Sequence, residues 1–263
     1  MKPPTWLISE VRRLVDAIQE ESEPERGGSI VVSGMLSEQL ARELGAGARP
    51  GAVVAGDAGA GPESAEIRVH VMAGEPSTAD EAVVHTADRA AVPVVLVQLW
   101  PQERWTPPFV LTPFVVECSP GEGFPIEEIG RKIADAVEQW IELARRVPVL
   151  QEVVADKLAR SSVVRAALAG ALGRPASGAR PFLALEQVRL AARLQSLRGD
   201  PPPEQPPLVA GVAVAAVLLS FALREGARRA SDVVPAPLAN AAVAAGATWA
   251  LAAAARRFSL TTG

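Results

Sequence analysis

The chain has 263 residues, of which 49% are hydrophobic, and it carries a formal net charge of −4. This length suits two domains of ordinary size. A net acidic chain without a basic aromatic patch argues against nucleic acid as a partner. The single cysteine excludes an internal disulfide and fits a reducing compartment. No secretory signal is expected at the start of the chain, so the sequence predicts a cytoplasmic protein.

The first part of the chain alternates strands and helices. An amphipathic helix is predicted over residues 5–20, and a polar linker continues to residue 26. Beyond it, hydrophobic periodicity predicts strands at 29–33, 52–55, 66–73, 92–99 and 114–118, and helices at 37–44, 78–89 and 126–146. This alternation predicts an α/β domain over residues 27–147, with a mostly parallel sheet and helices on its faces. A ligand is then expected at the carboxyl ends of the strands.

The second part, residues 148–263, is predicted to be an all-helical domain. Apolar residues recur every three to four positions over 149–172 and 183–197, and a proline-rich spacer begins at Pro201. Two uncharged runs follow, of sixteen residues at 208–223 and twenty-three residues at 233–255. Together they predict an apolar helical hairpin over residues 208–256.

The hairpin admits two interpretations. The first run is short for a membrane span, and the second is long enough but rich in alanine. Residues 1–147 have a net charge of −10 and the remainder +6, which fits attachment of the basic, apolar end to an anionic membrane. A buried helical pair in a soluble domain is the alternative. The residues predicted to carry the membrane contact are Leu208, Val214, Leu218, Phe221, Leu238, Trp249 and Leu251.

Two segments of the α/β domain, PFVVECSPGEGFPIEEI at residues 113–129 and VPVVLV at residues 92–97, resemble parts of a GTPase domain of the Era type. In PFVVECSPGEGFPIEEI, residues 113–129, the matching positions are Gly121, Gly123, Ile126 and Ile129. The guanine-contacting Ser-Ala-Lys of the family is replaced by Glu-Cys-Ser, with Cys118 at its centre. The strand VPVVLV, residues 92–97, resembles the one that delivers Asn-Lys-x-Asp, but Leu99, Trp100 and Gln102 stand there instead.

The phosphate-binding signatures of that family are also missing. A phosphate loop needs Gly-x4-Gly-Lys-Ser/Thr, whereas Gly34 is followed by Met-Leu-Ser-Glu-Gln-Leu. Asp57 stands where an Asp-x-x-Gly switch would begin, with Gly61 one place late. The resemblance therefore implies a Rossmann-like, GTPase-like fold without catalytic residues, cofactor or bound nucleotide, that is, a pseudo-GTPase. The altered nucleotide-site positions are Gly34, Asp57, Gly61, Leu99, Trp100, Gln102 and Cys118.

The helical part resembles a domain that follows GTPase-like domains in some bacterial proteins, often membrane-associated ones. The traces are PVLQEVVADKL at 148–158 and ARPFLALEQVRL at 179–190, with Arg180 where that family usually has Asp. The resemblance implies a bacterial protein associated with the cytoplasmic face of a membrane. Its protein partner is not identified by any residue.

Other groups of residues suggest alternatives to a pseudo-GTPase. An active NTPase would place Gly56, Asp57, Gly59 and Gly61 near phosphates. A catalytic triad of Ser33, His70 and Asp57 is disfavoured, because no nucleophile-elbow glycines surround the serine. No metal site is expected at His70 or His85, because no cysteine or carboxylate pair recurs at metal-ligand spacing.

The loop after the strand at 92–99 carries aromatic residues: Trp100, Trp105 and Phe109. They are interpreted as a plug in an empty nucleotide site, with a partner-binding patch as the alternative. The sequence as a whole predicts a non-catalytic interaction or scaffolding protein at a membrane. A fully soluble partner-binding module remains open.

Overall fold

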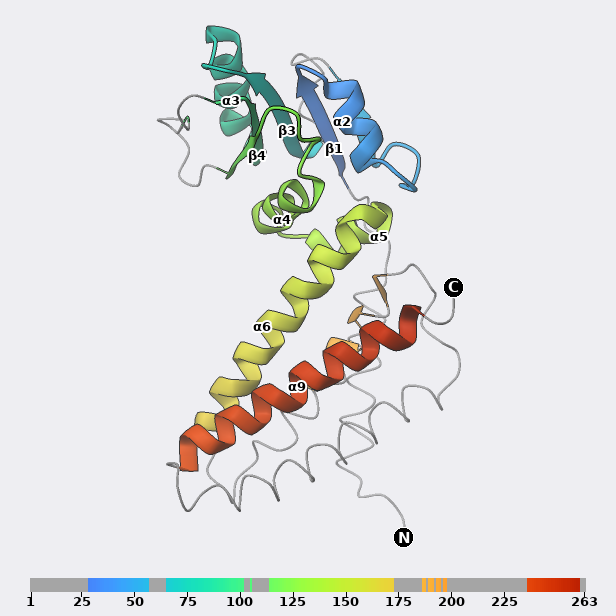
Figure 1. Ribbon diagram of the computed structural model, residues 1–263, viewed down its shortest axis with the longest axis vertical. Helices are drawn as coiled ribbons and strands as arrows, with labels where there is room; N and C mark the ends of the chain where they lie inside the picture. Colours follow the sequence, from blue (N-terminus) through green and yellow to red (C-terminus); the bar gives the residue numbers. More distant parts are fainter. Residues whose placement is uncertain are drawn as a thin grey trace. The chain divides into compact units, whose positions relative to one another are not determined.

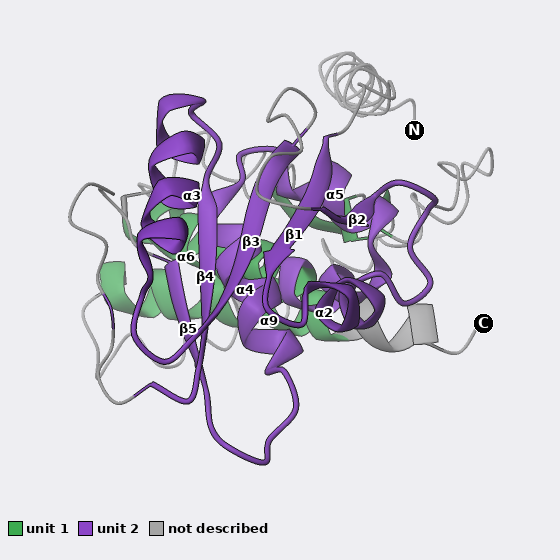
Figure 2. Ribbon diagram, turned by 90° about the horizontal axis from the view of Figure 1, so that it is seen from above, with its two compact units in different colours: residues 1–24, 155–263 green, residues 25–154 purple. Residues whose placement is uncertain are grey.

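The computed structural model describes residues 28–56, 65–101, 105, 114–172, most of 186–197, and 236–260. The predicted helix at 5–20 and the first apolar run at 208–223 lie outside these residues, as do Asp57, Gly61, Gln102 and Phe109. Residues 25–154 form one compact unit, and the helical residues described after them belong to a second (Figure 2).

The first unit is built around a five-stranded sheet (Figure 1). Its strands are β1 Ser29–Gly34, β2 Val53–Ala55, β3 Ala65–Ala73, β4 Val94–Leu99 and β5 Phe114–Cys118. They lie in the order β2-β1-β3-β4-β5, and every neighbouring pair is parallel. The predicted α/β class with a parallel sheet is confirmed. This order is one of the two common doubly wound arrangements.

The helices of this unit follow the strands in the chain. They are α2 Ser37–Leu44, α3 Thr78–Arg89, α4 Ile126–Ala136 and α5 Trp140–Arg146, followed by the 3-10 turn η2 Pro148–Leu150. The prediction of one helix over 126–146 is wrong, because Val137 is extended at φ −99° and ψ 137°. Val137 is only 6% exposed. A buried β-branched residue thus interrupts the helix where neither glycine nor proline marks a break.

The two faces of the sheet differ in polarity. Aligned residues on neighbouring parallel strands point to the same face, and the register aligns Ser33 with His70 and His70 with Leu96. Helix α3 covers this face, because its Val84 and Ala87 belong to one buried cluster with Leu96. The opposite face is apolar, and its fully buried residues are Ile30, Val32, Ile67, Val69, Val95, Val97 and Val116.

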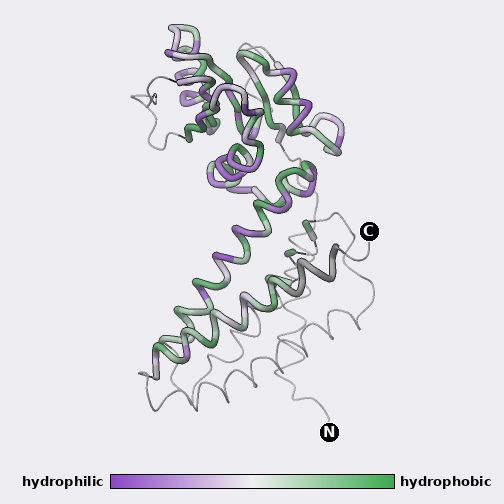
Figure 3. Tube along the Cα trace, in the orientation of Figure 1, coloured by the Kyte–Doolittle hydropathy of each residue, from purple (hydrophilic) through white to green (hydrophobic). Residues whose placement is uncertain are grey.

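The second unit contains the long helix α6 Gln151–Leu172, which begins in the first unit, and α9 Ala236–Leu260. The predicted apolar run at 233–255 thus falls largely on α9, whose colours in Figure 3 are mostly pale or green. The two helices touch at a glycine: a Cβ on Gly170 would lie 2.7 Å from the Asn240 carbonyl oxygen and 3.0 Å from the Ala244 Cβ. Small residues permit this approach. Ala244, Ala247 and Thr248 are buried on α9.

Candidate functional site at the carboxyl edge of the sheet

The strand order places a switch point between β1 and β3. The chain passes from β1 to β2 on one side, whereas β3 is followed by β4 on the other side. Doubly wound folds bind ligands in the crevice that such a reversal leaves at the carboxyl ends of the strands. The side chains at the ends of β1 and β3, and in the connections that follow them, therefore define the candidate site.

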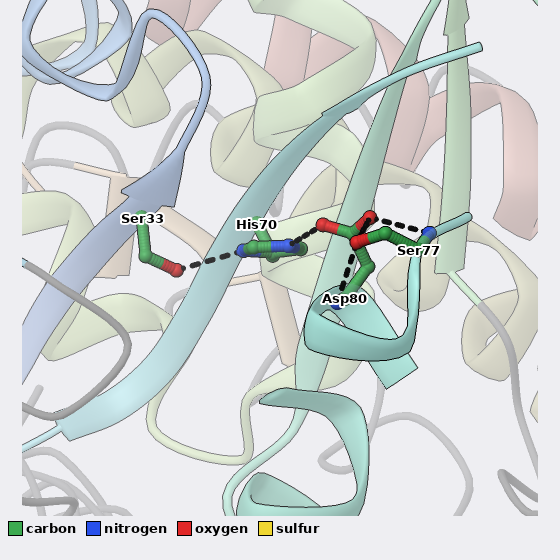
Figure 4. Close-up of polar contacts among 4 residues, drawn as sticks. All are labelled: Ser33, His70, Ser77 and Asp80. Atoms are coloured by element: carbon green, nitrogen blue, oxygen red, sulfur yellow. Dashed lines mark hydrogen bonds and ion pairs between the residues drawn. The ribbon is translucent and has the colours of Figure 1, made fainter. Parts of the chain in front are cut away.

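A chain of hydrogen bonds crosses the switch point (Figure 4). Ser33 Oγ on β1 lies 3.0 Å from His70 Nδ1 on β3, and His70 Nε2 lies 2.8 Å from Asp80 Oδ1 at the start of α3. Because the Asp80 carboxylate accepts, the Nε2–H tautomer satisfies both contacts: Nε2–H donates to Asp80 and Nδ1 accepts from the Ser33 hydroxyl. Ser33 and His70 are 0% and 3% exposed.

Asp80 is fixed by the N-terminus of its own helix. The Ser77 backbone N–H and hydroxyl donate to Asp80 Oδ2 over 2.8 and 2.6 Å, and the Asp80 N–H donates back to Ser77 Oγ over 3.3 Å. This reciprocal arrangement is a capping box. Burial alone raises the pKa of Asp80, but the hydrogen bonds from Ser77 and His70 outweigh it and hold the pKa below its ordinary value.

The spacing is that of a Ser-His-Asp triad, but the surroundings are not. The acid is Asp80, which the sequence interpretation did not consider; Asp57 lies outside the described residues. A nucleophilic serine stands exposed on a sharp turn after its strand. Ser33 instead lies within β1 with no exposed surface, so no acyl group reaches its hydroxyl. The arrangement links β1, β3 and the start of α3 through a largely buried chain of hydrogen bonds.

The connection from β1 to α2 is much shorter than a phosphate loop. Only Met35 and Leu36 separate the end of β1 from the start of α2. The Met35 N–H donates to the Val71 carbonyl over 2.9 Å, so it does not face outward. Gly34 has φ +89°, and a Cβ there would lie 2.0 Å from the same carbonyl oxygen. The glycine serves the turn against β3 and forms no loop around an anion.

The helix N-termini at this edge are acidic. The first turns hold Glu38 in α2, Asp80 and Glu81 in α3, and Glu127 and Glu128 in α4. These helices follow parallel strands directly, so their N-termini lie at the carboxyl edge. A helix N-terminus attracts anions through its N–H groups and its dipole. Carboxylates in the first turn already interact with that dipole and repel a phosphate.

The two described tryptophans that follow β4, Trp100 and Trp105, differ in exposure. The buried Gln98 side chain donates to the Gly74 carbonyl and accepts from the Trp105 N–H, each over 3.1 Å. Trp105 packs against the cluster that includes Leu96. Trp100 is instead 51% exposed and has φ +51°. The structure therefore places Trp105 partly buried against this cluster and Trp100 at the surface.

Cys118 ends β5 beside these residues and is 4% exposed. Burial and, secondarily, the Glu128 carboxylate raise the pKa of the Cys118 thiol to about 11. It is therefore a neutral thiol at physiological pH and not a nucleophile. Within the described ranges, no three His, Cys, Asp or Glu side chains gather as a metal site.

Comparison with known proteins found no matching family model, no matching curated protein and no matching solved structure. Among the helices that the structure describes, none combines the length and hydropathy needed to cross a bilayer. The first apolar run, residues 208–223, lies outside those helices.

Proposed function

We propose that this chain is a non-catalytic interaction protein, built on a GTPase-like α/β domain that does not bind nucleotide. The two-residue connection between β1 and α2 carries the proposal. A phosphate loop wraps its ligand with outward-facing backbone N–H groups over some eight residues. Here the Met35 N–H is bonded to Val71, and Leu36 enters α2 directly.

Two further observations support the loss of nucleotide binding. The acidic first turns of α2, α3 and α4 repel polyphosphate at the edge where it would have to sit. Gln98, near the end of the strand that resembles the base-recognition strand, is buried and bonded to Gly74 and Trp105. Its amide is therefore already engaged within the protein.

Titration calorimetry with GTP, GDP and ATP in the presence of Mg²⁺ tests this proposal on the full-length chain. We expect no saturable binding at micromolar concentrations, while an active Era-type GTPase run in parallel binds. Micromolar binding of GTP or GDP would overturn the proposal. Magnesium-dependent hydrolysis that is lost in Asp57→Ala would instead establish the alternative of an active NTPase.

We further propose that the helical part attaches the protein to the cytoplasmic face of a bacterial membrane. The net charge of +6 beyond residue 147 and the apolar runs at 208–223 and 233–255 support this part. The close contact of Gly170 with Asn240 and Ala244 favours the alternative for the second run, a helix packed within a soluble module.

Fractionation of the full-length chain with an alkaline carbonate wash distinguishes these alternatives. Membrane attachment predicts that the chain stays in the washed membrane and that Val214→Glu with Leu218→Glu releases it. The control, Val164→Glu on α6, introduces the same charge at an apolar residue that is 58% exposed. Recovery of the unmodified chain in the soluble fraction would refute membrane attachment and leave the soluble partner-binding module.

A further inference from the structure

Three large apolar side chains are exposed at the carboxyl edge of the sheet. Met35, Leu36 and Trp100 are 51%, 48% and 51% exposed. Met35 and Leu36 follow β1, Trp100 follows β4, and only β3 lies between these strands. Two strand spacings amount to about 10 Å, so the backbone positions of these three residues lie within about the width of one helix. We call these three residues the apolar centre.

Carboxylates are exposed at the same edge of the sheet as the apolar centre. Glu38, Glu81 and Glu128 are exposed in the first turns of α2, α3 and α4, and Glu75 and Glu122 are exposed in the connections before α3 and α4. Within the described residues, no first turn at this edge contains lysine or arginine; the nearest arginine in α4, Arg131, pairs with Glu127. We call the first five carboxylates the acidic rim.

Two members of the apolar centre have a strained backbone. Leu36 has φ +54° and Trp100 has φ +51°, in the left-handed region that glycine adopts readily and bulky residues rarely enter. Strained residues persist where the surrounding structure enforces them, and they concentrate at functional sites. Glycine at position 100 would relieve the strain and remove an exposed indole, so folding alone does not favour tryptophan there.

We propose that this edge is the docking surface for a basic amphipathic helix of a partner protein. Resting on the non-catalytic function proposed above, this inference adds the chemistry of the partner. The apolar side chains of the helix would pack on the apolar centre, with Trp100 as the central anchor. Its arginines or lysines would face the acidic rim, which steers the encounter and fixes the orientation. The same rim repels an anionic membrane and phosphate ligands.

The test uses the full-length chain and a fluorescein-labelled peptide of about sixteen residues, with leucine and phenylalanine on one helical face and arginine on the other. Fluorescence anisotropy is expected to show saturable binding that weakens as salt increases. An otherwise identical peptide with glutamate in place of arginine is expected not to bind. Absence of binding by the basic peptide, or equal binding by both peptides, would overturn the proposal.

Variants locate the binding surface. We expect Trp100→Gly to weaken binding at least tenfold while its thermal midpoint is unchanged or higher. Glu81→Lys combined with Glu128→Lys should weaken binding about tenfold and reduce its salt dependence. The control Val54→Ser changes a 41% exposed residue on edge strand β2 and should leave binding unchanged. Binding to Trp100→Gly as tight as to the unmodified chain would refute the assignment of the surface.

Two further outcomes would replace the partner helix with another occupant. Self-association of the chain in sedimentation experiments, abolished by Trp100→Gly, would identify a second copy. Binding of anionic vesicles that is lost in the same variant would identify a membrane. Either result would overturn the partner-helix assignment and leave the nucleotide titration unaffected. Micromolar nucleotide binding would instead overturn the function on which the assignment rests.

Discussion

Ser33→Ala tests whether the hydrogen-bond chain across the switch point is structural. The substitution removes the donor to His70 Nδ1, which lies 3.0 Å from the hydroxyl. His70 is 3% exposed, so water does not replace the lost donor, and Nε2–H remains bonded to Asp80. A buried polar atom without a partner costs about 1–2 kcal/mol. We therefore expect Ser33→Ala to lower the free energy of unfolding by about that amount.

Urea denaturation at pH 7.5 measures the effect. His70→Ala should lower the free energy of unfolding further, by about 3–4 kcal/mol, because it leaves a cavity as well as an unpaired Ser33 hydroxyl. In a double-mutant cycle the two changes should couple by about 1 kcal/mol, since either one removes the same bond. Thr86→Ala is the control on the exposed face of α3 and should stay within about 0.5 kcal/mol of the unmodified chain. A Ser33→Ala protein as stable as the unmodified chain would refute a structural role.

Three further substitutions probe other contacts by urea denaturation. Gly34→Ala should lower the free energy of unfolding by about 3 kcal/mol or more, because it forces a Cβ against the Val71 carbonyl at φ +89°. An unfolding midpoint near that of the unmodified chain would contradict this geometry. Gly170→Val should destabilise the helical unit by about 2 kcal/mol, because the larger side chain separates α6 from α9 at Asn240. A loss of stability below about 0.5 kcal/mol would show that the helices do not depend on this contact. Glu66→Gln should stabilise the protein by about 1 kcal/mol or less at pH 7.5, because burial destabilises the charged Glu66 carboxylate more than the Arg146 guanidinium and the Gly28 backbone stabilise it. Burial raises the pKa of Glu66, so the unmodified chain loses stability as pH rises above the ordinary carboxyl pKa, and the advantage of the variant should vanish below it.

The sequence predicted the elements of the α/β unit because their signals are local. Helix α3 begins after Ser77 and contains Asp80 three residues later, a capping pattern visible in the sequence, and β4 is an uninterrupted apolar run. The break between α4 and α5 was not predictable in the same way. It depends on the burial of Val137, which only the packed structure decides.

The candidate site was predicted only in part because it depends on strand pairing. Ser33 and His70 were placed in strands, but their contact joins residues 37 positions apart and follows from the parallel register of β1 and β3. Asp80 was missed as the acid although its capping position was a usable signal: a carboxylate at the start of α3 faces the switch point. Trp100 and Trp105 are close in sequence, but Trp100 is exposed whereas Trp105 packs against the buried cluster, a difference that only the packed structure decides.

The carboxyl edge of this sheet differs in polarity from the corresponding edge of nucleotide-binding domains. Such domains present backbone N–H groups and a lysine to the ligand and keep the sheet beneath apolar. Here Ser33, His70 and Gln98 are buried on the α3 face, while Met35 and Trp100 are exposed above it. On the function proposed above, we expect that a lysine introduced after β1 would not create a phosphate site, since only Met35 and Leu36 connect β1 to α2. The edge is instead suited to apolar contact through Met35 and Trp100. The buried hydrogen bonds hold β1, β3 and the start of α3 together beneath these side chains.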